Sequence, residues 1–199
     1  MKHFWITGLL VATLGLHAGA QEYRDSIVRY RKQYVVDLLK ESRLHMTHEQ
    51  ARNLSFFQPD SAYRAWATFT PTVGGQPFKV DTHSGKQKPF KEYGVLTFTI
   101  HDTVLQLHVY QSIDLMKEDA HKDELFVPFN DETNYVTTYG GGRYLDLDIK
   151  NIHDGGMLVD FNKCYNPYCA YADGFSCPIP PKENMLHLEI RAGEKTFTQ

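Results

Sequence analysis

The spacing of apolar residues changes once along the chain, from helical steps to strict alternation. Towards the N-terminus, apolar residues recur at three- and four-residue steps, at Ile27, Tyr30, Tyr34 and Leu38. This spacing predicts a helix over residues 22–42 with one face turned towards a core. Thr47 and Gln50 have the spacing of a capping box, which predicts a second, short helix.

Beyond these helices the apolar period becomes two, which is typical of strands. Apolar and polar residues alternate over 96–100 and again over 105–109, and this predicts an antiparallel hairpin with one buried face. Shorter runs over 78–80, 145–149 and 186–190 predict further strands. The expected fold class is therefore α+β and mainly antiparallel β, with one or two N-terminal helices packed on a β-sheet or a small barrel.

Residues 1–20 have a pattern of their own. Lys2 precedes a short apolar run, and small residues stand at Ala18 and Ala20, which is typical of a secretory signal peptide. The run is short for a bilayer core of about 30 Å, although a membrane anchor is the alternative interpretation. We therefore expect an exported protein, periplasmic or secreted, whose residues 21–199 form a single globular domain without a stable membrane span after cleavage.

Composition narrows the class of protein without identifying a reaction. The 199 residues are 42% hydrophobic and 13% aromatic, which indicates a globular chain rather than a disordered one. The 21 basic residues nearly balance the 24 acidic residues, so neither nucleic acid nor an anionic membrane is an expected partner. No metalloprotease or nucleophile-elbow motif occurs, and no cofactor is predicted. The oligomeric state stays open.

Three cysteines, Cys164, Cys169 and Cys177, lie within fourteen residues. Export to an oxidising compartment favours pairing, and an odd number leaves one thiol over. A structural zinc site needs four ligands, usually in closely spaced pairs. The intervals here are four and seven residues, so no metal site is expected. A disulfide and reduced structural thiols remain the main alternatives.

The segment 160–184 carries most of the candidate chemistry. Polar residues lie among prolines and aromatics at Asp160, Asn162, Tyr165, Asn166 and Asn184. One interpretation is a concave site in which Asp160 acts as an acid or base and the asparagine amides donate hydrogen bonds. The other is that these side chains cap turns in a long irregular crossover. A polar loop of this length is also a common place for a binding site.

A glycine triplet at 140–142 precedes Arg143 and Tyr144. Glycines allow a close backbone approach to an anionic ligand, and Arg143 could bind a carboxylate or phosphate. The triplet lacks the Gly-Lys-Ser/Thr ending of a phosphate loop, and no helix follows it. The alternative is a tight turn into a strand, with Arg143 paired to a carboxylate such as Asp160.

Several runs together resemble domain-of-unknown-function family 1684, a group of bacterial and archaeal proteins without an established activity. The strongest matches are the run 160–171 and the Cys-Pro-x-Pro-Pro-x-Glu-Asn run at 177–184. Further matches lie at 56–60, 125–129 and 138–144. The resemblance covers most of residues 21–199. It implies no activity, because the family has none assigned.

The resemblance does imply a cysteine pairing. The family pattern places cysteines at Cys169 and Cys177 and a small residue such as alanine at the position of Cys164. It therefore implies a disulfide between Cys169 and Cys177, with Cys164 as the odd thiol. Such a bond would close a nine-residue loop and stabilise the chain by roughly 2.6 kcal/mol in the chain-entropy model.

Two functional hypotheses follow, both centred on the segment 160–184. The first is an exported binding or structural module for a small polar or anionic ligand, whose pocket is lined by Arg143, Tyr144, Asp160, Asn162, Tyr165, Asn166 and Asn184. The second is a hydrolase-like enzyme that uses Asp160, Tyr165 and Asn166 in the same pocket. A split-barrel binder of flavin or another cofactor is a third hypothesis, suggested by a small β-rich domain with many aromatics.

Overall fold

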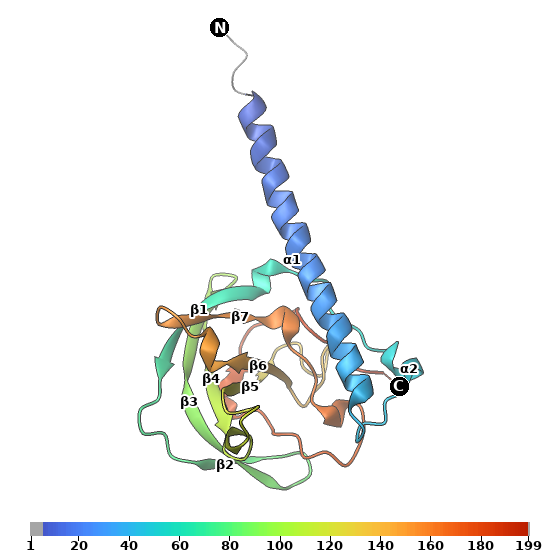
Figure 1. Ribbon diagram of the computed structural model, residues 1–199, viewed down its shortest axis with the longest axis vertical. Coiled ribbons are helices and arrows are strands. Elements are labelled where there is room, and N and C mark those ends of the chain that lie inside the picture. Colours follow the sequence, from blue (N-terminus) through green and yellow to red (C-terminus); the bar gives the residue numbers. More distant parts are fainter. Residues whose placement is uncertain (1–5, 199) are drawn as a thin grey trace.

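The computed structural model describes residues 6–198, with side chains from residue 19 onward. Residues 1–5, the positively charged start of the expected signal peptide, and residue 199 lie outside the described part. The expected domain of residues 21–199 is therefore described almost completely. Its helices are N-terminal to a curled antiparallel sheet (Figure 1), which confirms the predicted fold class.

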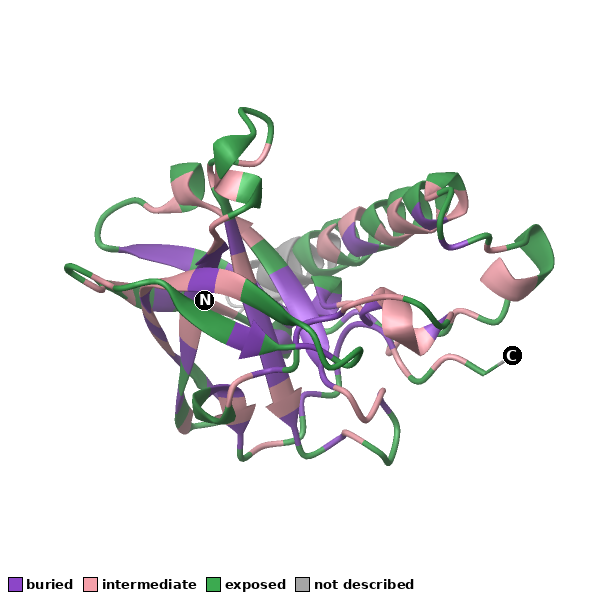
Figure 2. Cartoon of the chain, turned by 90° about the horizontal axis from the view of Figure 1, so that it is seen from below, coloured by how far each residue is buried: buried purple, intermediate pink, exposed green. Residues whose placement is uncertain are grey.

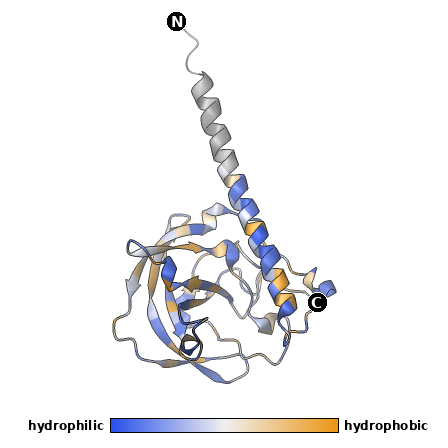
Figure 3. Ribbon diagram, viewed as in Figure 1, coloured by the Kyte–Doolittle hydropathy of each residue, from blue (hydrophilic) through white to orange (hydrophobic). Residues whose placement is uncertain are grey.

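The first element is a long helix, α1 (Ile6–Lys40). Its C-terminal half packs against the domain through Ile27 and Leu38, which are almost fully buried. Along this half, hydrophobic and hydrophilic residues alternate (Figure 3), as expected for a helix with one packed side. The predicted helix over 22–42 is confirmed, although it begins further towards the N-terminus. No helix in the described residues combines the length and apolar character needed to cross a membrane.

The second helix, α2 (His48–Ala51), is a single turn with a complete capping box. The Gln50 amide donates to Thr47 Oγ1 across 3.1 Å, and the Thr47 amide donates to Gln50 Oε1 across 2.9 Å. This arrangement confirms the sequence prediction, because each side chain satisfies a backbone N–H group that the short helix leaves free. Leu44, in the link between the helices, packs with Leu38 and Tyr171.

Eight strands and six 3-10 turns make up the rest of the domain. The strands are β1 (Arg64–Pro71), β2 (Phe78–Asp81), β3 (Gln87–Ile100), β4 (Thr103–Ser112), β5 (Glu124–Asp131), β6 (Arg143–Asp148), β7 (Gly156–Asp160) and β8 (Met185–Leu186). The 3-10 turns are η1 (Ser61–Tyr63), η2 (Leu115–Lys117), η3 (Ile149–Asn151), η4 (Phe161–Lys163), η5 (Tyr168–Ala170) and η6 (Lys182–Asn184). The strand order is β6-β5-β4-β3-β1-β7, with β2 paired to β3 and β8 paired in parallel to β5.

The β3–β4 hairpin is the pair that the alternating pattern predicts. Leu96 lies opposite Leu107, and Phe98 lies opposite Leu105, so that one face of the hairpin is apolar. In Figure 2 buried residues are spread along the strands, whereas the connecting loops are mostly intermediate or exposed. The residues of this main core that have no exposed surface include Ala67, Leu96, Leu107, Val109, Val127, Phe129, Met157, Val159 and Phe161.

The curl of the sheet brings its two ends together. β6 and β7 stand at opposite ends of the strand order, yet the chain that follows β7 pairs with β6 through Tyr144 and Tyr165. The Tyr144 amide donates to the Tyr165 carbonyl across 2.9 Å, and the Tyr165 amide returns a bond of 3.1 Å. The sheet is therefore a half-barrel that one bridge joins across its open side.

The two faces of β6 have different environments. Arg143 and Leu145 point into the main core side, whereas Tyr144 and Asp146 point to the opposite face. This follows from the two-residue period of a strand. The same alternation on β5 separates Phe126 from its core-facing neighbours. The opposite face carries the candidate site.

The prediction of a full strand over 186–190 is wrong. Only Met185 and Leu186 form a strand, although Ile190 is buried as the alternation requires. Beyond Leu186 the Glu132 amide, just after β5, still donates to the Leu188 carbonyl across 3.3 Å. At Ile190 side chains bind the backbone: its amide donates to Asp131 Oδ1 across 3.2 Å, and Arg143 Nη2 donates to its carbonyl across 2.8 Å. The buried ion pair of Arg143 and Asp131 thus supplies hydrogen bonds that a neighbouring strand would supply in a sheet.

Candidate functional site

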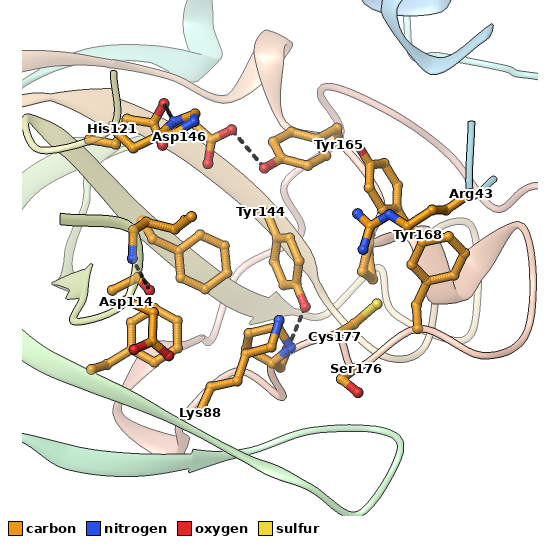
Figure 4. Close-up of a pocket in the computed structure, with 18 of the residues that line it drawn as sticks. Arg43, Lys88, Asp114, His121, Tyr144, Asp146, Tyr165, Tyr168, Ser176 and Cys177 are labelled. Atoms are coloured by element: carbon orange, nitrogen blue, oxygen red, sulfur yellow. Dashed lines mark hydrogen bonds and ion pairs between the residues drawn. The ribbon is translucent and has the colours of Figure 1, made fainter. Parts of the chain in front are cut away.

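A cavity of about 750 Å³ lies beside β6, mainly on the sheet face opposite the main core. Strands β3, β5 and β6 and the end of β4 form one side, and residues 165–178, here called the wall segment, form the other (Figure 4). Arg43, which follows α1, also lines it. The volume falls within the range of about 300–1,000 Å³ typical of small-molecule sites, and we call this cavity the pocket.

Aromatic rings form the sides of the pocket. The Tyr144 ring lies 4.7 Å from Phe126 and 5.9 Å from Tyr165 between centroids, edge to face in both pairs. Phe90 stacks on Phe126 at 5.6 Å. The Tyr144 hydroxyl donates to the Pro178 carbonyl of the wall segment. These contacts hold the rings in place, so the pocket is formed before any ligand enters.

Asp146 and Tyr165 make the main polar contact inside the pocket. The Tyr165 hydroxyl donates a hydrogen bond of 2.7 Å to Asp146 Oδ2, drawn as a dashed line in Figure 4. Burial raises the pKa of the Asp146 carboxyl to about 6; the Tyr165 bond lowers it and the charge of Glu124 raises it. The carboxyl is packed among other groups of the pocket, but Asp146 is exposed to solvent through the open side of the pocket.

The remaining charges of the pocket differ in whether they are paired. Glu124 accepts a hydrogen bond of 2.6 Å from His121, and Asp114 pairs with Lys117 at 3.1 Å. In the described part of the chain, neither Asp146 nor Lys88 has an ion-pair partner. Asp173, which also lines the pocket, has none either. The described part of the pocket therefore holds two carboxylates, Asp146 and Asp173, and one ammonium, Lys88, that no ion pair neutralises.

Arg143 does not line the pocket. It is fully buried on the core side and pairs with Asp131 at 2.7 Å. It also donates to the carbonyls of Ile190, Ala192 and Glu194. The sequence interpretation placed Arg143 and Tyr144 in one site, but adjacent strand residues point to opposite faces. The carboxylate that it binds is Asp131 rather than Asp160.

Asp160 and Asn162 connect the sheet to α1 and to the preceding loop. The Tyr23 hydroxyl of α1 donates to Asp160 Oδ1 across 2.9 Å, and the Asn162 amide donates to the same oxygen across 3.0 Å. The Asn162 side chain accepts from the Asp60 amide at 2.8 Å and donates to the Asp60 carbonyl at 2.7 Å. Both side chains therefore satisfy backbone groups and the helix contact, away from the pocket.

Asn166 and Asn184 bind backbone at two separate places. The Asn166 side chain donates to the Lys195 carbonyl across 2.8 Å. Asn184 accepts from the His108 amide at 2.7 Å and donates to the Pro128 carbonyl at 2.7 Å. Of the seven predicted binding residues, the structure brings only Tyr144 and Tyr165 to the pocket.

The glycine triplet is a packed turn. Gly142 has φ of +87°, a left-handed conformation that glycine adopts without strain, and a Cβ atom there would lie 2.5 Å from Pro180 and 2.8 Å from the Phe129 carbonyl. A Cβ atom on Gly141 would meet Tyr139 and His83. The close approach that the glycines permit is therefore to this protein's own atoms, at the start of β6.

Cys169 and Cys177 form a disulfide, as the family resemblance implies, and Cys164 is a buried free thiol. Burial raises the pKa of the Cys164 thiol to about 11, so it stays protonated near neutral pH. Cys177 lines the pocket, and the disulfide therefore fixes part of the wall segment. The described residues contain no group of three or more metal-binding side chains placed around one point.

The sequence interpretation missed Asp146, Lys88 and Arg43. Asp146 could have been found, because it follows Tyr144 by two residues and so shares its strand face. Lys88 and Arg43 reach the pocket from distant segments, and no local pattern marks them. The segment 160–184 contributes Tyr165, Pro167, Tyr168 and residues 173–178 to the lining of the pocket.

Fold and pocket together define a small α+β protein with a half-barrel sheet and a preformed aromatic cavity on its outer face. The family described as protein of unknown function (DUF1684) matches residues 49–195, and the chain belongs to this family. It is similar to the solution NMR structure of an uncharacterised protein from Haloarcula marismortui, with 31% identity over 93% of this chain and 96% of that one, and a TM-score of 0.61. No curated protein matches the chain.

Proposed function

We propose that this protein is an exported binding protein for a small molecule, and that the pocket beside β6 is its binding site. The observation that best supports this proposal is the preformed pocket of about 750 Å³, in which aromatic rings lie beside Asp146, a carboxylate without an ion-pair partner in the described residues. Sites of this size, largely apolar with a few convergent polar groups, are the usual form of a small-molecule site. The ligand predicted from sequence was polar or anionic, and the pocket offers charges of both signs.

Export is supported by where α1 begins to contact the domain. Gly19 to Glu22 are exposed, and Tyr23 makes the first long-range contact of the described side chains, to Asp160. Cleavage after Ala20 would therefore keep every long-range contact that the described side chains of α1 make to the domain. Cell fractionation followed by N-terminal sequencing tests this proposal, with Gln21 as the expected first residue. An intact Met1 in the cytoplasmic fraction would contradict it.

Binding is tested by blocking the pocket. Ser112→Trp places a large side chain on the pocket lining, whereas Val73→Trp adds the same group at a position that is 94% exposed and outside the pocket. In a fragment screen by protein NMR, the unmodified protein and Val73→Trp should show shift changes at the wall segment and β6, and Ser112→Trp should lose them. If no compound changes those signals, the pocket is not a binding site.

The hydrolase hypothesis does not enter this proposal. Asp160 binds Tyr23 and Asn162, and Asn166 binds Lys195, so neither shares the pocket with Tyr165. Three groups that do not converge cannot act on one substrate atom.

A further inference from the structure

At one end of the pocket Asp146 has no ion-pair partner in the described residues, because the neighbouring His121 pairs with Glu124 instead. Asp146 accepts a hydrogen bond only from Tyr165 among the described side chains, and that donor is neutral. A partly desolvated carboxylate is more stable beside a cation. The rings of Tyr144 and Tyr165 stand next to it (Figure 4), and aromatic faces attract ammonium groups. This end is therefore complementary to a ligand ammonium.

Two cations, Lys88 and Arg43, lie away from that end. Figure 4 shows both on the other side of the Tyr144 ring from Asp146. Burial lowers the pKa of the Lys88 ammonium, the nearby positive charge of Arg43 lowers it further, and the charge of Asp114 raises it by less. The Arg43 guanidinium pairs only with Glu41, at 3.1 Å, and lies 5.6 Å from the centre of the Phe175 ring. An anion between these two cations would relieve their repulsion.

The other pocket charges do not change this division. Glu124 pairs with His121 and Asp114 with Lys117, although the charge of Asp114 also acts on Lys88. Asp173 lines the pocket from the wall segment and, like Asp146 and Lys88, has no ion-pair partner in the described residues. Asp146 and Lys88 thus remain without an ion-pair partner at the two ends of the pocket. Between them the sides are aromatic.

We infer that the ligand is an aromatic amino acid or short peptide with free termini, whose ammonium group binds Asp146 and whose carboxylate binds Lys88 and Arg43. This inference rests on the proposed binding function and specifies the chemical class of its ligand. The aromatic side chain packs against the rings that separate the two charged ends. A ligand that lacks one of these charges leaves the protein charge at that end of the pocket without a partner.

Calorimetric titration with matched probes tests the inference. L-phenylalanine and the dipeptide Phe-Phe represent the two sources of this chemistry, and each is compared with its N-acetylated form and its C-terminal amide. At least one free compound should bind about tenfold more tightly than either of its blocked forms, the usual effect of one charge-assisted hydrogen bond. Asp146→Asn should remove the advantage over the acetylated form, and Lys88→Met the advantage over the amide.

Matched controls are Asp119→Asn and Lys79→Met, which change the same residue types at exposed positions outside the pocket. Both should bind as the unmodified protein does, and amide NMR spectra establish that all four variants are folded. If free and blocked compounds bind equally, or if none binds while the fragment screen still detects other compounds in the pocket, the inference fails and the proposed function stands. If no compound enters the pocket at all, both fail.

Discussion

The Tyr165 hydroxyl donates to Asp146 across 2.7 Å, although nineteen positions and the whole of β7 separate these residues in the chain. They meet because the segment after β7 crosses the open side of the half-barrel and pairs with β6 at Tyr144. The contact that closes the sheet therefore also builds the polar end of the pocket. A change that breaks the pairing of Tyr144 with Tyr165 would therefore disturb both the sheet and the pocket.

Removing the Tyr165 hydroxyl should raise the pKa of Asp146 above its value of about 6, because the hydrogen bond stabilises the ionised carboxylate and lowers that pKa. Tyr165→Phe tests this through the NMR titration of the Asp146 carboxyl carbon. The free energy of unfolding at neutral pH should fall by about 1 kcal/mol, the usual contribution of one hydrogen bond. Tyr139→Phe, whose hydroxyl makes no contact with Asp146, is the control. An unchanged or lower pKa in Tyr165→Phe would contradict the assigned donor.

The protein should lose stability as the pH rises from about 4.5 to 7. Burial raises the pKa of Glu194 from 4.5 to about 7, against the lowering effect of the hydrogen bonds from Asn166, Tyr171 and Tyr34. A carboxyl with a raised folded pKa is most stabilising when protonated, so its contribution is complete below pH 4.5 and is lost as the pH passes through 7. The shift corresponds to about 3 kcal/mol.

Urea unfolding at pH 4.5, 6 and 8 measures this dependence. Glu194→Gln cannot ionise, so its free energy of unfolding should fall by less than half as much over the same interval. Glu189→Gln, which alters an exposed pair with Arg191, should retain the full decrease. Equal slopes in the unmodified protein and in Glu194→Gln would show that Glu194 does not titrate in this range.

Arg143→Met should destabilise the protein by about 3–5 kcal/mol, because it leaves the buried Asp131 carboxylate without its cation. The carbonyls of Ile190 and Ala192 would lose a donor as well. Neutralising the partner in Arg143→Met/Asp131→Asn should recover part of this loss, and a double-mutant cycle by urea unfolding measures the coupling. A loss below about 1 kcal/mol in the single variant would contradict a buried pair.

Loss of the Cys169–Cys177 bond should lower the free energy of unfolding by roughly 2.6 kcal/mol and loosen the wall segment. Cys169→Ser/Cys177→Ser and reduction of the unmodified protein should have the same effect on urea unfolding. Cys164→Ala should keep its sensitivity to reductant, since Cys164 is the free thiol. If Cys164→Ala instead loses its sensitivity to reductant, the disulfide involves Cys164 and the assigned pairing is wrong.

Local sequence patterns predicted the elements whose conformation depends on residues that are close together in the chain. The β3–β4 hairpin follows from alternation, and the α2 capping box from the spacing of Thr47 and Gln50. The segment after Leu186 keeps the predicted burial but not the strand. Its hydrogen-bond partners are Asp131 and Arg143, and no local pattern reveals side chains that arrive from distant strands.

The site was predicted less well, for two physical reasons. Polar residues of the segment 160–184 were grouped by sequence proximity, but Asp160, Asn166 and Asn184 each bind a different piece of backbone. Arg143 and Tyr144 were grouped although a strand separates neighbours onto opposite faces. Applying that period to β6 would have excluded Arg143 and selected Asp146.

The contacts of Arg143 also bear on the order in which this protein can fold. Its three carbonyl acceptors belong to residues 190–194, which follow it in the chain by 47 to 51 positions. Until those residues emerge from the ribosome, the guanidinium and Asp131 would have to be buried with their partners incomplete, which is unfavourable. During synthesis, this part of the core should therefore form only after residues 190–194 have left the ribosome, so that folding of β6 waits for a segment far along the chain.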